Sequence, residues 1–208
     1  MADHTTYGLV CSELSEDLSK TNLGELKLDS FQDNSVQIKI KAASLNFPDL
    51  LMTQGKYQNR PNLPFALGME GAGIVEKVGS GVSSFKEGDE VMFGGWGHGA
   101  IAESIILPEG LVSLKPKSLN FSEAASFKTA YLTAYVGLIR RGELKQGETL
   151  LVHGASGGVG MAAVQMGKLY GAKVIASGTS DEKLKIVKTW GADEIINTGL
   201  EGSVSFRE

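Results

Sequence analysis

One segment, residues 149–176, constrains the fold of this chain more than any other. A short apolar run, Leu150–Val152, ends in a cluster of glycines, and a second apolar run begins at Val174. Between the two runs, apolar side chains recur at helical spacing. A strand, a tight turn, a helix and a second strand in this order form the unit that binds dinucleotides in open parallel sheets. The segment therefore predicts an α/β fold.

The turn of this segment reads Ala155-Ser156-Gly157-Gly158-Val159-Gly160, a G-x-G-x-x-G pattern with alanine in the first glycine position. All six are candidate cofactor-binding residues. Gly157 lets the backbone approach a pyrophosphate, because a Cβ there would occupy the phosphate's space. Gly160 lets the helix pack closely on the strand, and the helix N-terminus offers unpaired N–H groups to the anion. A glycine cluster alone is a weak signal in a chain with 27 glycines, but the flanking elements make this one strong.

The residues after the second strand indicate which nucleotide is bound. In a site for NAD, an acidic residue about 20 positions after the glycines holds the ribose 2′-hydroxyl. Here Ser177 stands at the expected strand end, and Ser180 and Lys183 follow. Hydroxyls and an ammonium accept a 2′-phosphate that a carboxylate would repel, so these three residues favour NADPH over NADH. The alternative is structural: Thr179 and Glu182 have the spacing of a helix capping box, and Lys183 is then a solvated lysine.

Composition excludes several classes of function. The net charge of −4, without a basic patch, does not favour binding to nucleic acid or to an anionic membrane. The single cysteine, Cys11, excludes an internal disulfide and a cysteine-based structural zinc site. No apolar run approaches the roughly 20 residues of a membrane span, and the first residues lack the pattern of a secretory signal. We therefore expect a cytoplasmic protein that binds neither nucleic acid nor membrane.

The pattern along the chain divides it into two predicted domains, residues 1–120 and 121–208. Short strands separated by glycine turns, typical of a small irregular barrel, make up the first domain. We expect them at 7–11, 36–42, 73–78, 90–93, 100–106 and 112–114. The second domain is expected to hold a long helix from Ser122 to Gly142, strand 149–153, helix 159–170, strand 173–177, helix 181–190 and strand 193–196. This βαβαβ order predicts a parallel sheet that is half of a dinucleotide-binding fold.

The barrel and the glycine turn together resemble the medium-chain dehydrogenase/reductase superfamily. The segments Gly68–Val75 and Gly88–Val91, upstream of Ala155–Gly160, complete the resemblance. Within the superfamily the chain is similar to the zinc-free NADPH:quinone oxidoreductases of the zeta-crystallin-like branch. The resemblance implies a GroES-like barrel domain followed by a Rossmann-type domain. Because members are usually longer, we expect a C-terminal truncation, with the second half of the sheet missing and weak or no turnover by the fragment.

The departures from zinc alcohol dehydrogenases concern the metal. Those enzymes have a cysteine before His-x-Asp where this chain has Asn46-Phe47-Pro48-Asp49, and Gly-His-Glu where it has Gly68-Met69-Glu70. Of these ligands only Glu70 remains, and one carboxylate does not hold zinc, so we expect no metal. Glu70 is then expected to pair with a buried cation or with backbone. His98 and His153 lack partners at metal spacing, and we expect His153, in a buried strand, to serve packing.

The resemblance also implies residues of a cleft for nicotinamide and substrate. Asn46, Asp49 and Tyr57 match lining positions of the family and are candidate catalytic residues. Asn46 either binds the nicotinamide ribose or an acceptor carbonyl, or caps the following turn together with Asp49. Tyr57 either donates a proton or forms a wall of the cleft, or only covers apolar surface. Thr129 falls where the family often contacts the cofactor, and the neighbouring Lys128 is a weaker candidate because it suits a surface lysine.

The expected chemistry is hydride transfer without a Lewis acid. A quinone, or a carbonyl conjugated to an alkene, accepts hydride at carbon and needs only positioning and hydrogen bonds to the developing oxyanion. The leading hypothesis is therefore NADPH-dependent reduction of a quinone. The alternatives are reduction of an activated double bond in an enone or enoyl thioester, and a non-catalytic nucleotide-binding protein. In its full-length form such a protein can be a homodimer. The acceptor and the proton donor are left open.

Overall fold

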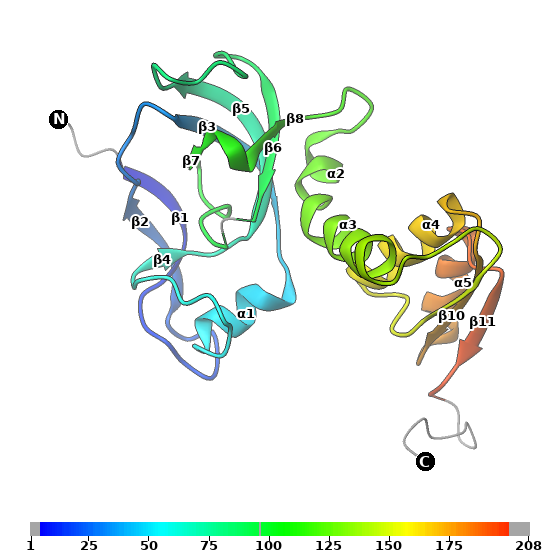
Figure 1. The fold of residues 1–208 in the computed structure, drawn as a ribbon. Coiled ribbons are helices and arrows are strands. Elements are labelled where there is room, and N and C mark those ends of the chain that lie inside the picture. The colour runs from blue at the N-terminus through cyan, green and yellow to red at the C-terminus, as the bar shows by residue number, and fades with distance from the viewer. Residues whose placement is uncertain (1–4, 96, 200–208) are drawn as a thin grey trace. The chain divides into compact units, whose positions relative to one another are not determined.

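The computed structural model describes residues 5–95 and 97–199, and the fold is drawn in Figure 1. The first four residues, where a secretory signal would begin, and the last nine lie outside the described residues. The chain forms two compact units, Met1–Thr129 and Ala130–Glu208. The sequence predicts a domain boundary after residue 120, just before helix α2 (Phe121–Ala125). In the structure α2 packs on strands of the first unit, which extends to Thr129.

A five-stranded antiparallel sheet is the centre of the first unit. Its order is β7 (Ser104–Pro108), β3 (Ser35–Ser44), β5 (Glu70–Val78), β6 (Glu90–Gly94) and β8 (Val112–Leu114). Val36, Ile38 and Val75 are buried in its core, as the alternation of apolar and polar residues predicts. The strand expected at 100–106 begins later, because residues 100–103 pair with the neighbouring sheet instead: Ile101 donates its N–H to the Leu67 carbonyl at 2.7 Å.

The second sheet of this unit has three strands, in the order β2 (Thr21–Lys27), β1 (Thr5–Cys11) and β4 (Phe65–Ala66). Only β1 is predicted from the sequence. Strand β2 lies at the edge and is mostly exposed, so it lacks the apolar alternation that marks a half-buried strand, and β4 has only two residues. The short helix α1 (Phe47–Thr53) has Pro48 in its first turn, a position where the missing N–H of proline costs nothing.

The single helix expected from Ser122 to Gly142 is wrong, because the chain breaks it near Ser126. Helix α2 begins with a capping box in which Asn120 and Glu123 accept each other's backbone N–H, at 2.9 and 2.8 Å. At its end the Ser126 hydroxyl donates to the Ser122 carbonyl, a local bond that competes with a continuing helix. Helix α3 (Lys128–Tyr135) follows and continues as a π-helix, η2 (Val136–Arg141).

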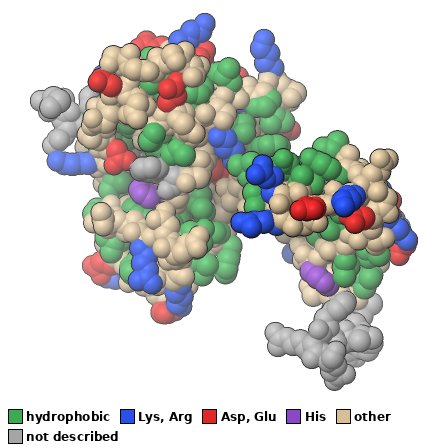
Figure 2. Space-filling view, viewed as in Figure 1, with side chains coloured by type: hydrophobic (Ala, Val, Ile, Leu, Met, Phe, Trp, Pro, Cys, Tyr) green, Lys and Arg blue, Asp and Glu red, His purple; other side chains and the backbone are tan. Residues whose placement is uncertain are grey.

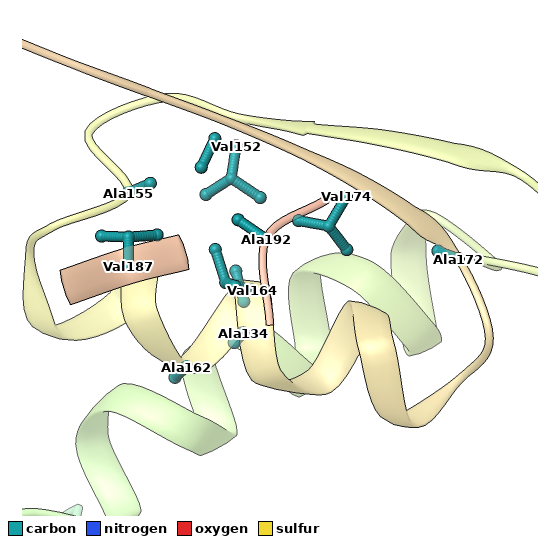
Figure 3. Packing of buried hydrophobic residues seen from close by; sticks show 11 residues of the cluster. Ala134, Val152, Ala155, Ala162, Val164, Ala172, Val174, Val187 and Ala192 are labelled. Carbon is teal, nitrogen blue, oxygen red and sulfur yellow. The ribbon is translucent and has the colours of Figure 1, made fainter. Parts of the chain in front are cut away.

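The second unit holds a parallel sheet in the order β11 (Glu194–Asn197), β10 (Lys173–Gly178) and β9 (Thr149–Val152). Helices α4 (Gly158–Leu169) and α5 (Asp181–Thr189) connect the strands, so the predicted βαβαβ order is confirmed. Figure 3 shows the small buried side chains, among them Val164 and Val174, that fill its core. Gly167 allows this close packing, because a Cβ there would lie 2.7 Å from Leu150 Cδ2. Strand β9 is at the edge of the described sheet, and its Leu151 is exposed.

The face of the molecule in Figure 2 carries charged side chains of both signs. On the face drawn in Figure 2, acidic and basic side chains are scattered among polar and apolar ones in both units. Among the described residues, no helix has the length and apolar character needed to cross a membrane.

Candidate functional site

The turn between β9 and α4 contains glycines with different tasks. Gly154 adopts φ +60°, a left-handed conformation that suits glycine. It therefore serves as the tight-turn glycine, which the sequence pattern placed one residue later, at Ala155. Ala155 is fully buried and donates its N–H to the Ser177 carbonyl at 3.0 Å. Gly160 is required by packing, because a Cβ there would lie 2.4 Å from the Gly154 carbonyl oxygen.

Gly157 and Gly158, in contrast, are not required by the protein's own packing. A Cβ on Gly157 would make only an ordinary contact, 3.4 Å from the Gly154 oxygen, and one on Gly158 would meet nothing within 4 Å. Gly157 is the N-cap of α4 and offers no side chain to its first turn. Ser156 and Val159 beside them are exposed. An open cradle of backbone at a helix N-terminus fits the pyrophosphate of a dinucleotide.

The end of β10 differs from the prediction. The strand ends at Gly178, and Ser177 is only 2% exposed. The Ser177 hydroxyl lies 2.9 Å from His153 Nδ1. The hydroxyl is therefore directed toward the residue after β9 and not beyond the end of β10. His153 is exposed, because β9 ends at Val152, and the expectation of a buried packing residue is wrong. Gly178, the last residue of β10, has no side chain, so no carboxylate stands at the end of this strand.

Helix α5 follows this strand end directly. Ser180 is its N-cap and accepts the Lys183 N–H at 3.4 Å, so the cap is Ser180 and not Thr179. The Lys183 side chain is exposed. The Ser180 hydroxyl and the Lys183 ammonium therefore stand one helical turn apart near the end of β10, next to a residue without a side chain.

In the first unit, a buried carboxylate joins residues from three parts of the chain. Glu70, at the start of β5, is 1% exposed. Its Oε1 accepts hydrogen bonds from Ser44 Oγ at 2.7 Å and Asn46 Nδ2 at 3.0 Å, and its Oε2 accepts the Thr129 N–H at 2.7 Å. The structure thus brings two predicted site residues, Asn46 and Thr129, onto one side chain. The expectation that Glu70 pairs with backbone is confirmed.

Asp49 makes the contacts of a capping residue. It is 1% exposed, and its two oxygens accept the N–H groups of Asn46 at 2.7 Å and Gly68 at 3.0 Å. Burial raises the pKa of Asp49, the two N–H donors oppose the rise, and the charge of Glu70 adds to it. Both oxygens of Asp49 are therefore engaged in holding the start of α1 against the Gly68 backbone.

Lys128 is the cation of this cluster. Its side chain is half-buried, and Nζ donates to the Leu111 carbonyl at 3.1 Å. Burial lowers the pKa of Lys128, and the opposite charge of Glu70 works against this effect. Gly94 makes room for both, since a Cβ there would lie 3.2 Å from Lys128 Cβ and 3.3 Å from Glu70 Cβ. The sequence indicated this cluster only through Glu70, which is retained although the other metal ligands of zinc alcohol dehydrogenases are replaced.

Tyr57 and Met69 belong to the apolar packing around α1. Both are half-buried, and they pack against a cluster of buried residues: Cys11, Met52, Phe65 and Leu67.

The donors around Glu70 do not fit a zinc ion. Its hydrogen-bond partners are an amide, a hydroxyl and a backbone N–H, and the charge of Lys128 acts on it, so its surroundings supply no thiolate or imidazole. Within residues 5–95 and 97–199, no group of three or more His, Cys, Asp or Glu residues is arranged to hold a metal ion.

Two family models match the chain. The alcohol dehydrogenase GroES-like domain matches residues 32–117, and the zinc-binding dehydrogenase family matches residues 158–206. The quinone oxidoreductase of Homo sapiens is 39% identical over 166 residues, which are 80% of this chain and 50% of the relative. The chain spans about half the length of the curated relatives it matches.

Solved structures give the same picture. The Escherichia coli quinone oxidoreductase in complex with NADPH has a TM-score of 0.83 and 33% identity, over 95% of this chain and 60% of that chain. The CurK enoyl reductase has a TM-score of 0.84 and 31% identity, over 94% of this chain and 60% of that chain. The similarity therefore extends over both units.

Proposed function

Because the chain belongs to the medium-chain dehydrogenase/reductase family, with a GroES-like domain and the start of a Rossmann-like domain, we propose that it transfers hydride from NADPH to a quinone without a metal. The observation that carries the proposal is the pair Gly157 and Gly158. Both are glycines at which the protein's own atoms would tolerate a Cβ, so a ligand gives the better reason for them. The similarity to quinone oxidoreductases, one of them solved with NADPH, supports the choice of substrate and cofactor.

The preference for NADPH over NADH rests on the end of β10. Gly178 presents no carboxylate to repel a 2′-phosphate, and the Ser180 hydroxyl and the exposed Lys183 ammonium follow within the first turn of α5. The buried Ser177 hydroxyl contacts His153, so Ser177 contributes to the preference for NADPH only indirectly. We propose that the turn from Ala155 to Gly160 binds the pyrophosphate through backbone N–H groups other than those of Ala155 and Gly157, which donate to the Ser177 and Gly154 carbonyls.

The protein's own part in the reaction is to bind and to orient. The bound nicotinamide cofactor supplies the hydride. We propose that Asn46 meets the nicotinamide ribose or the acceptor carbonyl through its amide, which Glu70 and Ser44 hold in place. Thr129 helps to place the cofactor, and Tyr57 forms a wall against the acceptor, which its packing against an apolar cluster suits. Asp49 holds the start of the helix that follows Asn46.

A second candidate function is reduction of an activated double bond in an enoyl thioester or enone. The similarity to the CurK enoyl reductase favours it. The hydride chemistry is the same, so the two functions differ only in the acceptor.

Binding and turnover of the purified protein test both functions. We expect NADPH to bind at least about tenfold more tightly than NADH, a difference of about 1.4 kcal/mol, in calorimetry or fluorescence quenching. NADPH oxidation is then measured with a quinone and with an enoyl thioester. Turnover of the thioester alone would favour the second function, and absence of NADPH binding would contradict both. A cytoplasmic location and a homodimer in the full-length form stay predictions, the latter testable by sedimentation.

A further inference from the structure

We propose that Glu70 is a positioning residue, whose buried carboxylate holds the Asn46 amide and the first turn of α3 in one fixed arrangement. The inference rests on the proposed function, in which Asn46 and Thr129 meet the cofactor or the acceptor. Glu70 itself touches neither and acts through the residues that it binds.

The first step concerns the orientation of Asn46. A carboxylate has only acceptors, so the end of the Asn46 side chain that faces Glu70 Oε1 at 3.0 Å must be the NH₂ group. The same NH₂ group donates to Ser44 Oγ at 3.2 Å, and the Ser44 hydroxyl donates in turn to Oε1. These three hydrogen bonds form a triangle of Ser44, Asn46 and Glu70. They direct the carbonyl oxygen of the Asn46 amide away from Glu70.

The second step concerns α3. The Thr129 N–H that binds Oε2 is one of the first N–H groups of that helix, which have no partner within the helix. A negative charge at this end interacts favourably with the helix dipole. The Glu70 side chain on β5 thereby binds both Asn46, the residue before α1, and Thr129, the second residue of α3.

The third step concerns the charge. A carboxylate that is 1% exposed would be costly without compensation. Three hydrogen-bond donors and the charge of Lys128 provide it. With its oxygens engaged by protein donors, Glu70 is committed to holding its neighbours.

The substitution Glu70→Gln tests this arrangement at constant shape. Glutamine has one acceptor and one donor group in place of two acceptors. Its NH₂ group must therefore face either the Thr129 N–H or the donors of Ser44 and Asn46. Glu76→Gln is the matched control, because Glu76 lies on the same strand but is exposed. The measurements are the Asn46 side-chain amide resonances, assigned by their loss in Asn46→Asp, the Kd for NADPH, and kcat and KM for a quinone.

In Glu70→Gln we expect the Asn46 amide resonances to shift and kcat to fall at least about tenfold, with KM changed far less. Glu76→Gln should match the wild type. Unshifted Asn46 resonances together with a wild-type kcat in Glu70→Gln would overturn the proposal, as would a loss of stability that leaves both unchanged.

If Glu70→Gln does not fold, the substitution Ser44→Ala tests the positioning role of Glu70 instead. It removes one corner of the triangle and leaves Glu70 with its other donors. A shift of the Asn46 resonances and a several-fold lower kcat support the proposal, and wild-type values of both overturn it. If the wild-type protein does not bind NADPH, the proposed function fails, while the Asn46 resonances in these variants still show whether Glu70 orients that amide.

Discussion

The glycine turn of the second unit and the Glu70 cluster of the first unit are built in opposite ways. The turn depends on the absence of side chains: Gly157 and Gly158 leave space at the N-terminus of α4. The Glu70 cluster works through side chains that are present, buried and hydrogen-bonded. The turn is six consecutive residues, whereas the cluster joins positions 44, 46, 70 and 129. A contiguous backbone site is therefore robust to distant changes, and an assembled site depends on every partner.

The largest effect is expected from Gly157→Val. Its side chain would fill the space proposed for the pyrophosphate, and we expect the Kd for NADPH to rise by at least about 100-fold, or about 2.7 kcal/mol. Stability should fall by only about 1 kcal/mol, because a Cβ at this position makes an ordinary contact with the protein and the main cost is that valine is a poorer N-cap than glycine. Calorimetry and a thermal melt measure the two quantities. Unchanged NADPH affinity would show that the turn is not the cofactor site.

Gly160→Ala should give the reverse result. A Cβ there would lie 2.4 Å from the Gly154 oxygen, so we expect overpacking to cost about 1–3 kcal/mol in urea unfolding. Binding should weaken only as far as the turn is displaced. If Gly160→Ala is as stable as the wild type, the distinction between packing glycines and ligand glycines in this turn does not hold.

Asp49→Asn tests the assembled region by pH. Its folded pKa is raised, chiefly by burial, so its contribution to stability is present below the unfolded pKa and is lost as pH rises through the folded pKa. We expect Asp49 to contribute a component of wild-type stability that falls over this acidic window, and Asp49→Asn to lack that component of the slope. Because asparagine replaces one of the two acceptors of the carboxylate, it should also cost about 1–3 kcal/mol at pH values where Asp49 is ionised. Urea unfolding between pH 3 and 7 measures both, and equal slopes would contradict the assignment.

The smallest effect is expected from Lys183→Gln. The lysine is exposed, so its contact with a 2′-phosphate should be worth only about 1 kcal/mol, a several-fold weaker Kd for NADPH with NADH unchanged. Lys185→Gln, an exposed lysine on the same helix, is the control. The difference should shrink with added salt. Equal losses for both nucleotides would remove Lys183 from the specificity argument.

Local pattern was sufficient for the second unit and only partly for the first. Strand β9, helix α4 and strand β10 were predicted within a residue or two, because apolar periodicity and glycines mark their ends. Strand β2 and the break at Ser126 were missed, since an exposed edge strand lacks alternation and a serine bond to Ser122 leaves no periodic mark. In the site, the close packing at Gly160 could be predicted from the sequence, but the burial of Ser177 and the exposure of His153 could not.

The amino-acid sequence alone determined the fold class and the glycine turn, because each depends on the type and order of neighbouring residues, and its resemblance to a family indicated the loss of the thiolate and imidazole at the zinc positions. Only the tertiary structure decided that Gly154 is the tight-turn glycine and that Glu70 gathers Ser44, Asn46 and the Thr129 N–H. The reason is physical. A backbone conformation and a buried carboxylate's partners depend on which distant segments pack together, and the hydrogen-bond requirement of a buried charge is met only after that packing.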